Sequence, residues 1–467
     1  MEPDFRETLY TVDKKGRRKW VYATLAEGYF HRRRQIVAYS LIAFYLLMPW
    51  VTINGRQGIH FDFPNRKFIL FGQQFWATDS YFLFLVFGML AFSLFFFTAV
   101  AGRLWCGWAC PETVFLEFVF RPIERWIEGS PAQRKRLDDG PWTAEKIRKK
   151  LLKHGLCAVI SWVLASSFLA YFIGREPLLQ MMSDWPHHNP VPFALTLIFM
   201  GVMAFQFGWF REQFCTVLCP YARFQSVLMD SSTLVVGYDV VRGEPRGKLR
   251  KAAETPQGDC IDCKMCVRVC PTGIDIRNGV QLECISCTQC IDACDDVMRK
   301  VDKPTGLIRY DTEDRLLGKK QLRGLLRPRP FVYGTILLVY AGIFLYAVST
   351  RELTDFQVLR GKGIAPYIAL EDGRIANQFQ VRVSNKGDEA VAYTFHIEPM
   401  DSLQLIIPIV PLKIGPDEMQ TVPAFVNFQR ESLQAGNLKA VVTIEGSDGF
   451  TDSQEVTLLG PDAAGGE

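Results

Sequence analysis

The chain has 467 residues, which is enough for two or three domains, and a formal net charge of only +4. A charge this small gives no reason to expect a nucleic-acid partner. Aromatic residues make up 13% of the chain and gather in apolar runs, yet the mean hydropathy is only slightly positive. This composition predicts a membrane protein with large parts outside the bilayer.

Five apolar runs are predicted to cross the membrane, which would place the two termini on opposite sides. The runs are residues 36–51, 81–101, 156–173, 191–210 and 331–348. The connection 53–79 alternates polar and apolar residues and contains Asn54-Gly55, which predicts a small external β-hairpin.

Basic residues predict the orientation. Segment 102–153 carries eleven Lys and Arg residues, whereas 174–190 carries only Arg175. Because short cytoplasmic loops are rich in Lys and Arg, we expect the N-terminus, 102–153 and the long segment after the fourth run to lie in the cytoplasm. The tail after the fifth run would then be periplasmic, and it contains no Cys.

An internal repeat follows the second and fourth apolar runs. The first copy reads W-C-G-W-A-C-P with Cys106 and Cys110, and the second reads F-C-T-V-L-C-P with Cys215 and Cys219. Two cysteines four residues apart share one face of a helix, so each pair could bind a metal or take part in redox chemistry. The alternative is that these small side chains simply pack at helix ends.

Eight further cysteines form two runs with the spacing C-x2-C-x2-C-x3-C. This spacing is typical of bacterial ferredoxins, in which the fourth Cys of each run ligates the other cluster. We therefore predict two [4Fe–4S] clusters. The predicted ligands are Cys260, Cys263, Cys266 and Cys294 for one cluster, and Cys284, Cys287, Cys290 and Cys270 for the other.

Zinc and disulfides are the alternatives for these eight cysteines. Zinc sites usually pair two C-x2-C units across a longer gap, and disulfides need an oxidising compartment. Two runs of identical spacing favour iron–sulfur clusters over both.

The tail from about residue 352 lacks a helical period and shows short alternating runs separated by Gly-containing turns, which predicts an immunoglobulin-like β-sandwich. The predicted architecture is a multi-domain membrane protein with five parts. These are a cytoplasmic arm (1–35), a four-helix transmembrane region with the two Cys repeats (36–230), a cytoplasmic 2[4Fe–4S] ferredoxin-like domain with linkers (231–330), a fifth transmembrane helix (331–350) and a periplasmic sandwich (351–467).

The motifs at 105–111 and 214–220, the Cys runs at 260–294 and the opening of the sandwich at 377–387 together resemble the FixG/CcoG/RdxA family of cytochrome c oxidase accessory proteins. The resemblance covers nearly the whole chain. It implies a bacterial inner-membrane protein that reduces Cu(II) to Cu(I) during assembly of a cbb-type oxidase. It carries the cluster role onto the eight cysteines, and a copper or redox role onto Cys106, Cys110, Cys215 and Cys219.

The chemistry of the motifs leaves three functions to compare. The first is a membrane-bound cupric reductase fed by a cytoplasmic electron donor, with copper chaperones or oxidase assembly factors as partners. The second is a quinol-linked electron conduit to a periplasmic reductase. The third is a non-catalytic scaffold for oxidase assembly. No G-x-G-x-x-G follows a predicted strand, so direct use of NAD(P)H is not expected.

Overall fold

The computed structural model describes most of the chain. The residues outside the description are 1–10, 12–14, 16, 65–66, 76–79, 185–186, 189, 249–256, 320–326, 361–364, 388, 400–402, 434–435 and 462–467. The chain divides into two compact units, Met1–Leu345 and Tyr346–Glu467. Each unit builds a hydrophobic core of its own.

Four helices among the described residues are long and apolar enough to cross a membrane. They are α2 (Ser80–Ala101), α7 (Ala144–Ile173), α9 (Pro190–Phe205) with its π-helical extension η3 (Gln206–Phe210), and α15 (Pro328–Ser349). The apolar window of α15 has no buried residue, and Leu338 and Leu345 are 75% and 67% exposed. Apolar surface of this extent is stable against lipid, so these helices indicate a membrane protein.

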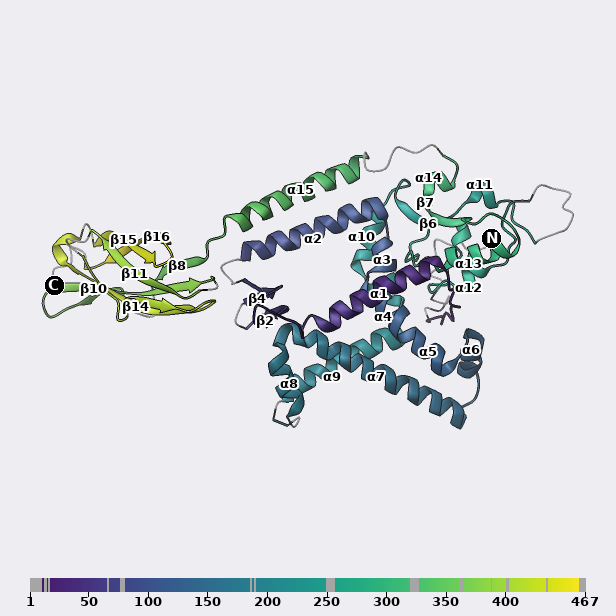
Figure 1. Ribbon diagram of the computed structural model, residues 1–467, viewed down its shortest axis with the longest axis horizontal. Helices are drawn as coiled ribbons and strands as arrows, with labels where there is room; N and C mark the ends of the chain where they lie inside the picture. Colours follow the sequence, from purple (N-terminus) through teal and green to yellow (C-terminus); the bar gives the residue numbers. More distant parts are fainter. Residues whose placement is uncertain are drawn as a thin grey trace. The chain divides into compact units, whose positions relative to one another are not determined.

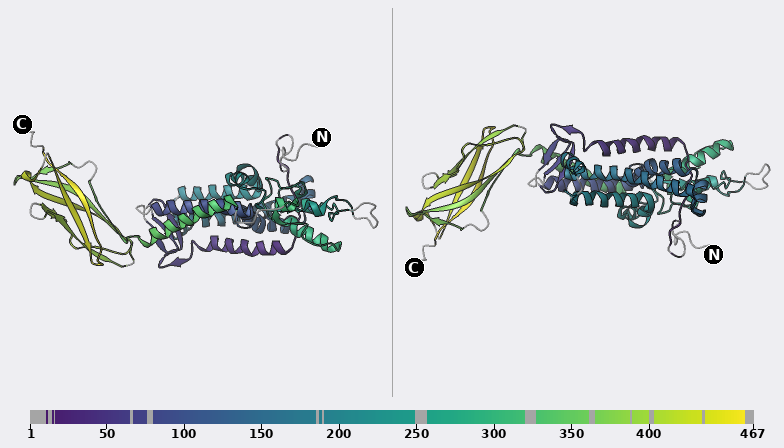
Figure 2. Two further views of the ribbon diagram at one scale, coloured as in Figure 1. Left: turned by 90° about the horizontal axis from the view of Figure 1, so that it is seen from above. Right: turned by 90° about the horizontal axis from the view of Figure 1, so that it is seen from below.

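Helix α1 (Tyr29–Leu47) contains the first predicted span but is not one of these four. It carries Arg32, Arg33 and Arg34 near its start, and three charged residues are more than the other four helices have in their apolar stretches. It nevertheless runs lengthwise with α2 and α7 (Figures 1 and 2). Five spans are therefore not confirmed, and α1 as a span stays a prediction.

The segment between α1 and α2 forms more than the single hairpin that the sequence predicts. Two short strands pair around Asn54-Gly55, and three further strands form an antiparallel sheet. A second tight turn at Phe71-Gly72, where both residues have positive φ, adds the last strand. The strands are β1 (Thr52–Ile53), β2 (Arg56–Gln57), β3 (Ile59–Asp62), β4 (Lys67–Leu70) and β5 (Gln73–Phe75).

The two C-x3-C-P motifs fold alike. Four residues before the first Cys of each motif the backbone turns through a positive φ, at Gly102 (56°) and at Arg211 (50°). A short helical turn then carries the first Cys: α3 (Leu104–Trp108) in one copy and η4 (Phe214–Leu218) in the other. The second Cys is the N-cap of the next helix, and the proline occupies its first turn, where the missing N–H costs nothing.

Short helices complete the first unit. After the first motif come α4 (Pro111–Phe115), η2 (Leu116–Phe120), α5 (Arg121–Glu128) and α6 (Pro131–Asp139). Helix α8 (Arg175–Ser183) connects α7 to α9, and α10 (Pro220–Leu228) follows the second motif.

The segment between α10 and α15 holds the eight cysteines of the two runs. It is framed by the antiparallel pair β6 (Leu234–Tyr238) and β7 (Ile308–Thr312). The helical elements are α11 (Val240–Gly243), α12 (Met265–Arg268), η5 (Ile276–Asn278), α13 (Gln289–Lys300) and α14 (Glu313–Leu316). Its core packs apolar side chains such as Val236, Ile291 and Ile308 against cysteines from both runs.

The second unit is the predicted β-sandwich. One sheet has the order β12-β14-β10-β8 with β9 paired to β10, and the other has the order β13-β11-β15-β16. The strands are β8 (Thr354–Leu359), β9 (Ile368–Ala369), β10 (Arg374–Asn385), β11 (Val391–Glu398), β12 (Leu403–Ile406), β13 (Leu412–Ile414), β14 (Met419–Gln429), β15 (Asn437–Gly446) and β16 (Thr451–Leu459).

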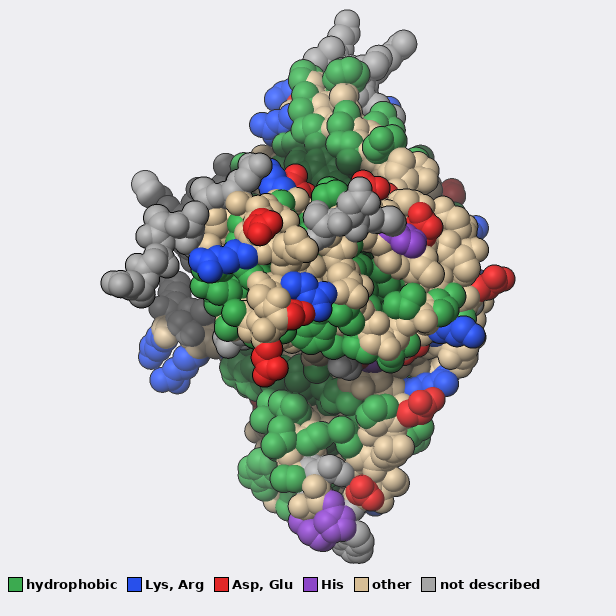
Figure 3. All heavy atoms as spheres, turned by 90° about the vertical axis from the view of Figure 1, so that its left-hand side faces the viewer, with side chains coloured by type: hydrophobic (Ala, Val, Ile, Leu, Met, Phe, Trp, Pro, Cys, Tyr) green, Lys and Arg blue, Asp and Glu red, His purple; other side chains and the backbone are tan. Residues whose placement is uncertain are grey.

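The core of this sandwich follows the pleat of its strands. Burial alternates along β8 and β11, so every second side chain enters the space between the two sheets. On the face of this unit visible in Figure 3, acidic and basic side chains are interspersed rather than sorted by sign. That face therefore offers no single-sign patch for a charged partner.

Candidate iron–sulfur site and the C-x3-C-P thiols

The two cysteine runs adopt the same backbone path. In each run the residue before the second Cys has a positive φ, at Asp262 (53°) and Ser286 (51°). The residue after the second Cys also has a positive φ and caps a helix, at Lys264 before α12 and Thr288 before α13. Such left-handed turns point successive groups of a short loop inward, so each run can surround one ligand.

The structure brings the eight cysteines together in two sets that cross between the runs. One cavity is lined by Cys260, Cys263, Cys266 and Cys294. A second cavity is lined by Cys270, Cys284, Cys287 and Cys290, with Cys266 at its edge. Each set has three thiols from one run and one from the other, which is the arrangement that two-cluster ferredoxins need.

The donor sets fit [4Fe–4S] clusters better than single ions. Over the described part of the chain, no three His, Cys, Asp or Glu side chains converge closely enough to hold one metal ion. A zinc site would need four sulfurs at about 2.3 Å from a common centre. Four thiols spread around a cavity instead match the four irons of a cubane cluster. Burial raises the pKa of Cys266, Cys287 and Cys294 to about 12, so the binding of a cluster would displace protons from these thiols.

The four thiols of the C-x3-C-P motifs lie near one another, between the two copies of the repeat. Burial raises the pKa of the Cys106 thiol to about 11, and the neighbouring thiols Cys110 and Cys219 add to the rise. Burial raises the pKa of Cys215 most, and Glu112 and Cys110 add to the rise. The Cys106 sulfur also lies 3.4 Å from the amide nitrogen of Gln225, a fully buried residue of α10, the helix that follows the second motif. The two copies of the repeat therefore bring their thiols near one another, although no three of them converge on one point.

The first C-x3-C-P motif packs directly on the second cysteine run. A Cβ added at Gly107 would overlap the carbonyl oxygen of Ser286 and come within 3.0 Å of that of Ile285. Trp108 donates its indole N–H to the Tyr310 hydroxyl (2.9 Å), which donates to the Ser286 carbonyl (3.2 Å). Gly107 is thus required for close backbone approach, whereas the matching residue of the second motif is Thr216.

Two buried arginines hold this interface. Arg34 of α1 donates from Nε to the Gly107 carbonyl and from Nη1 to the Cys287 carbonyl, both at 2.7 Å. Arg103 donates to the carbonyls of Leu282, Cys284 (3.2 Å) and Ala222 (3.0 Å). Arg34 is 1% exposed and Arg103 is 7% exposed. One guanidinium therefore links three parts of the chain that are far apart in sequence.

Comparison with known proteins adds family information to this geometry. A 4Fe-4S dicluster domain model matches residues 210–313, a 4Fe-4S binding domain model matches 81–129, and the model for the IG-like fold at the C-terminal of FixG matches 344–461. Protein RdxA of Cereibacter sphaeroides is 38% identical over 76% of this chain and 76% of its own length. Protein RdxB of the same organism is 36% identical over 92% of both chains. The nitrogen fixation protein FixG of Rhizobium meliloti is 31% identical over 89% of this chain and 87% of its own.

The chain belongs to the FixG/RdxA family. It is thus an iron–sulfur electron-transfer protein with a membrane region and an IG-like C-terminal domain, as the sequence predicts. The 4Fe-4S binding domain model covers Cys106 and Cys110, and the dicluster model covers Cys215 and Cys219 together with the eight cysteines of the runs.

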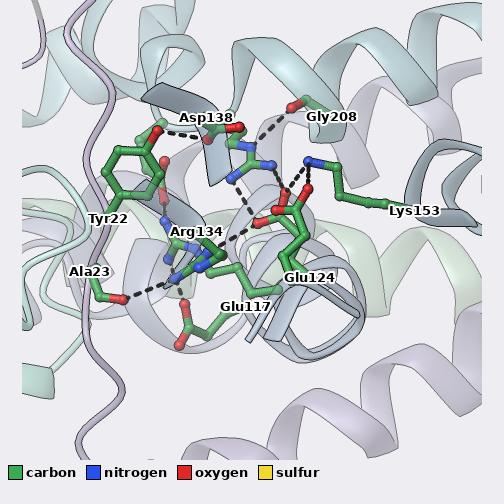
Figure 4. A network of polar contacts seen from close by, with 12 residues as sticks. Tyr22, Ala23, Glu117, Glu124, Arg134, Asp138, Lys153 and Gly208 are labelled. Atoms are coloured by element: carbon green, nitrogen blue, oxygen red, sulfur yellow. Dashed lines mark hydrogen bonds and ion pairs between the residues drawn. The ribbon is translucent and has the colours of Figure 1, made fainter. Parts of the chain in front are cut away.

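This FixG/RdxA-family chain also contains a buried ion network beside the thiol site. Figure 4 shows the carboxylate of Glu124 with Arg134 and Lys153 around it. Arg211, the turn residue of the second motif, donates to the same carboxylate from both Nη atoms. Burial alone would raise the pKa of Glu124, but Arg211, Lys153 and Arg134 lower it below the usual value. The network fixes the second motif to α5.

Sequence reasoning missed the residues that join the parts of the site. Arg34 reads as one member of a basic cluster that signals topology, because its partners lie 73 and 253 residues away. Glu124 similarly lies in a charged loop of ordinary appearance. The one available signal was the difference between the repeats, since Gly107 stands where the second copy has Thr216.

Proposed function

We propose that this protein is a membrane-bound cupric reductase that delivers Cu(I) for the assembly of a cbb-type cytochrome c oxidase. The observation that supports this is that the thiols of the two C-x3-C-P motifs lie near one another and beside the second cysteine run: Cys106 contacts Gln225 of α10, Cys215 lines one cavity with Cys287, and Gly107 packs on Ser286. Thiolates prefer Cu(I) to Cu(II), so a thiol pair favours the reduced product. The clusters, when bound, supply one electron at a time, which is what Cu(II) needs.

The residues of the chain divide the work. The eight cysteines of the runs would hold the clusters, and a pair of C-x3-C-P thiols would hold copper. Arg34 and Arg103 fix the distance between the two sites. When bound, the clusters would supply single electrons taken from a cytoplasmic donor, and the Cu(I) formed at the thiols would leave to a copper chaperone or an oxidase assembly factor.

The proposed topology has five spans, with α1 as the first. Within the first unit, the cysteine runs lie at one end of the long helices and strands β2 and β4 lie at the other (Figure 1). The Lys- and Arg-rich segment 102–153 belongs to the end with the cysteines, which supports a cytoplasmic position for that end in the inner membrane. The C-terminal sandwich then follows α15 into the periplasm.

The test uses purified full-length protein with both clusters reduced under anaerobic conditions. We expect added Cu(II) to reoxidise the clusters with formation of one Cu(I) per electron, monitored by EPR and a Cu(I)-specific chelator. Cys106→Ser and Cys215→Ser should slow this reaction, whereas Cys157→Ser, at a buried cysteine outside both motifs, should not. Unchanged reoxidation in the motif variants would contradict the copper role, and reduction of the clusters by quinol without any reaction with copper would favour the conduit function.

A further inference from the structure

The two cysteine runs do not stand in equivalent positions relative to the C-x3-C-P thiols. Gly107, Trp108 and Arg103 of the first motif all reach residues of the second run or the strand beside it. The contacts fall on residues 282–287, between and around the first two cysteines of that run. The second motif also lies beside this run, because Cys215 and Cys287 line the same small cavity.

The first run differs in its exposure. Cys263 is exposed to solvent, whereas every cysteine of the second run is at least partly buried. Lys264 and Arg268 beside it are also exposed. Because electron-transfer partners must bring their redox centres close together, an exposed ligand marks the edge that an external protein can approach.

The charges near the two runs also differ. Arg34 and Arg103 donate to backbone carbonyls and form no ion pair within the described part of the chain, although the buried carboxylate of Glu117 faces Arg34 across a small cavity. By contrast, Arg277, the cation beside Cys266, is ion-paired with both Asp275 and Asp262 at 2.6 Å. A buried cation outside an ion pair stabilises nearby negative charge more than one held by two carboxylates does.

From these observations we infer that the cluster that Cys270, Cys284, Cys287 and Cys290 would hold is the one that supplies electrons toward the C-x3-C-P motifs, and that Arg34 and Arg103 both dock its segment and stabilise its reduced form. The electron acceptor there would be Cu(II) held by the thiols, which gains one electron as the cluster loses one. The cluster that Cys260, Cys263, Cys266 and Cys294 would hold is then the one that faces the external donor. The direction of electron transfer, toward the C-x3-C-P motifs, rests on the proposed function. The effect of Arg34 and Arg103 on the potential of one cluster does not.

A hydrogen bond to sulfur supports the same assignment. The Thr272 hydroxyl lies 3.3 Å from the sulfur of Cys270, which lines the second cavity. Hydrogen bonds to cluster sulfurs favour the reduced state, as a nearby cation does.

The deciding experiment is a redox titration of copper-free holoprotein followed by EPR. Cys263→Ala and Cys287→Ala each remove a ligand from one cluster and assign the two signals. We expect Arg34→Gln and Arg103→Gln to lower the midpoint potential of the signal lost in Cys287→Ala and to leave the other unchanged. Arg277→Gln should affect only the signal lost in Cys263→Ala, and Arg299→Gln, at an exposed site, should affect neither. The inference would be overturned if Arg34→Gln shifted the signal lost in Cys263→Ala, or if neither Arg34→Gln nor Arg103→Gln shifted any signal.

Docking has its own readout, which needs no redox chemistry. Arg34→Lys keeps the charge but loses the fork that bonds Gly107 and Cys287 together. In Arg34→Lys the midpoint potential of the signal lost in Cys287→Ala should stay close to the wild-type value, while amide hydrogen exchange at residues 284–288 should become faster. Unchanged exchange there would exclude the docking role. If copper oxidises no form of the protein, the proposed acceptor is wrong, yet the titration and exchange results still decide the role of the arginines.

Discussion

Gly107 lies against the carbonyl of Ser286 so closely that no side chain fits between the two backbones. This is the contact that joins the first C-x3-C-P motif to the second cysteine run. Since the obstacle is backbone on both sides, a side chain at position 107 cannot be accommodated by a rotamer change. The two segments would have to separate.

Gly107→Ala should therefore loosen the interface. Overpacking of this kind costs about 1–3 kcal/mol, and we expect a lower unfolding midpoint together with faster hydrogen exchange at residues 284–288. Gly155→Ala is the matched control, because a Cβ at that helical glycine meets nothing within 4 Å. A Gly107→Ala protein as stable and as protected as wild type would show that the two segments are not in contact.

Ligand crossing between the runs, which the cysteine spacing predicts, can be tested directly. Cys294 belongs to the second run in sequence but lines the cavity of Cys260, Cys263 and Cys266. Cys294→Ala should remove the same EPR signal as Cys263→Ala, and Cys270→Ala the same signal as Cys287→Ala, each with about half of the iron lost. If Cys294→Ala instead removed the signal lost in Cys287→Ala, the assignment of ligands would be wrong.

The buried carboxylate of Glu124 should be important for stability. Removing one partner of a buried ion pair costs about 3–5 kcal/mol, because the remaining charges stay buried without compensation. Glu124→Gln should lower the free energy of unfolding by an amount in this range, measured by denaturant titration of the first unit in detergent. Glu145→Gln removes a carboxylate that pairs with Lys149 on the surface, and should leave the free energy of unfolding almost unchanged. Equal effects would contradict the buried network.

The same carboxylate predicts a pH dependence. Although burial opposes ionisation, the cations around Glu124 hold its pKa below the usual carboxyl value. A lowered folded-state pKa gives stabilisation that is complete above the unfolded-state pKa of about 4.5 and is lost as the pH falls through the folded-state value. The stability difference between wild type and Glu124→Gln should therefore shrink between pH 6 and the acid range. A difference that stays constant on acidification would show that Glu124 carries no charge in the folded protein.

The sandwich should unfold without affecting the clusters. Phe428 is 1% exposed in its core, and Phe428→Ala should cost about 3–5 kcal/mol in the C-terminal unit. Met419, in the same strand but 44% exposed, provides the control substitution Met419→Ala. Because each unit has its own core, iron content and the visible absorbance of the clusters should match wild type in both variants. Loss of iron in Phe428→Ala would mean that the units fold as one.

Local patterns in the sequence were enough to predict the separate parts of this protein. Cysteine spacing predicts the cluster sets because ligand order within a run is a local property, and alternation along strands such as β11 predicts the sandwich. The second strand pair near Phe71 was missed, since a positive φ at a phenylalanine leaves no mark in composition. The prediction that α1 spans the membrane stays unconfirmed, because its three arginines lie inside the helix rather than before it.

Relations between the parts could not be predicted in this way. Arg34 and Glu124 take their roles from partners that only the tertiary structure brings near. The difference between the two C-x3-C-P motifs was more informative than either motif alone. A glycine at only one of two equivalent positions indicates that another backbone segment packs closely against that position. The four C-x3-C-P thiols were expected in two pairs, and the closeness of the two pairs follows from the symmetry of the repeat.

The bridge made by Arg34 has a consequence for biogenesis. Its side chain belongs to the earliest helix to leave the ribosome, while the Cys287 carbonyl that it bonds is made some 250 residues later. The contact between α1 and the cysteine segment can therefore form only after residue 287 has been synthesised, so it is among the last contacts that the first unit can complete.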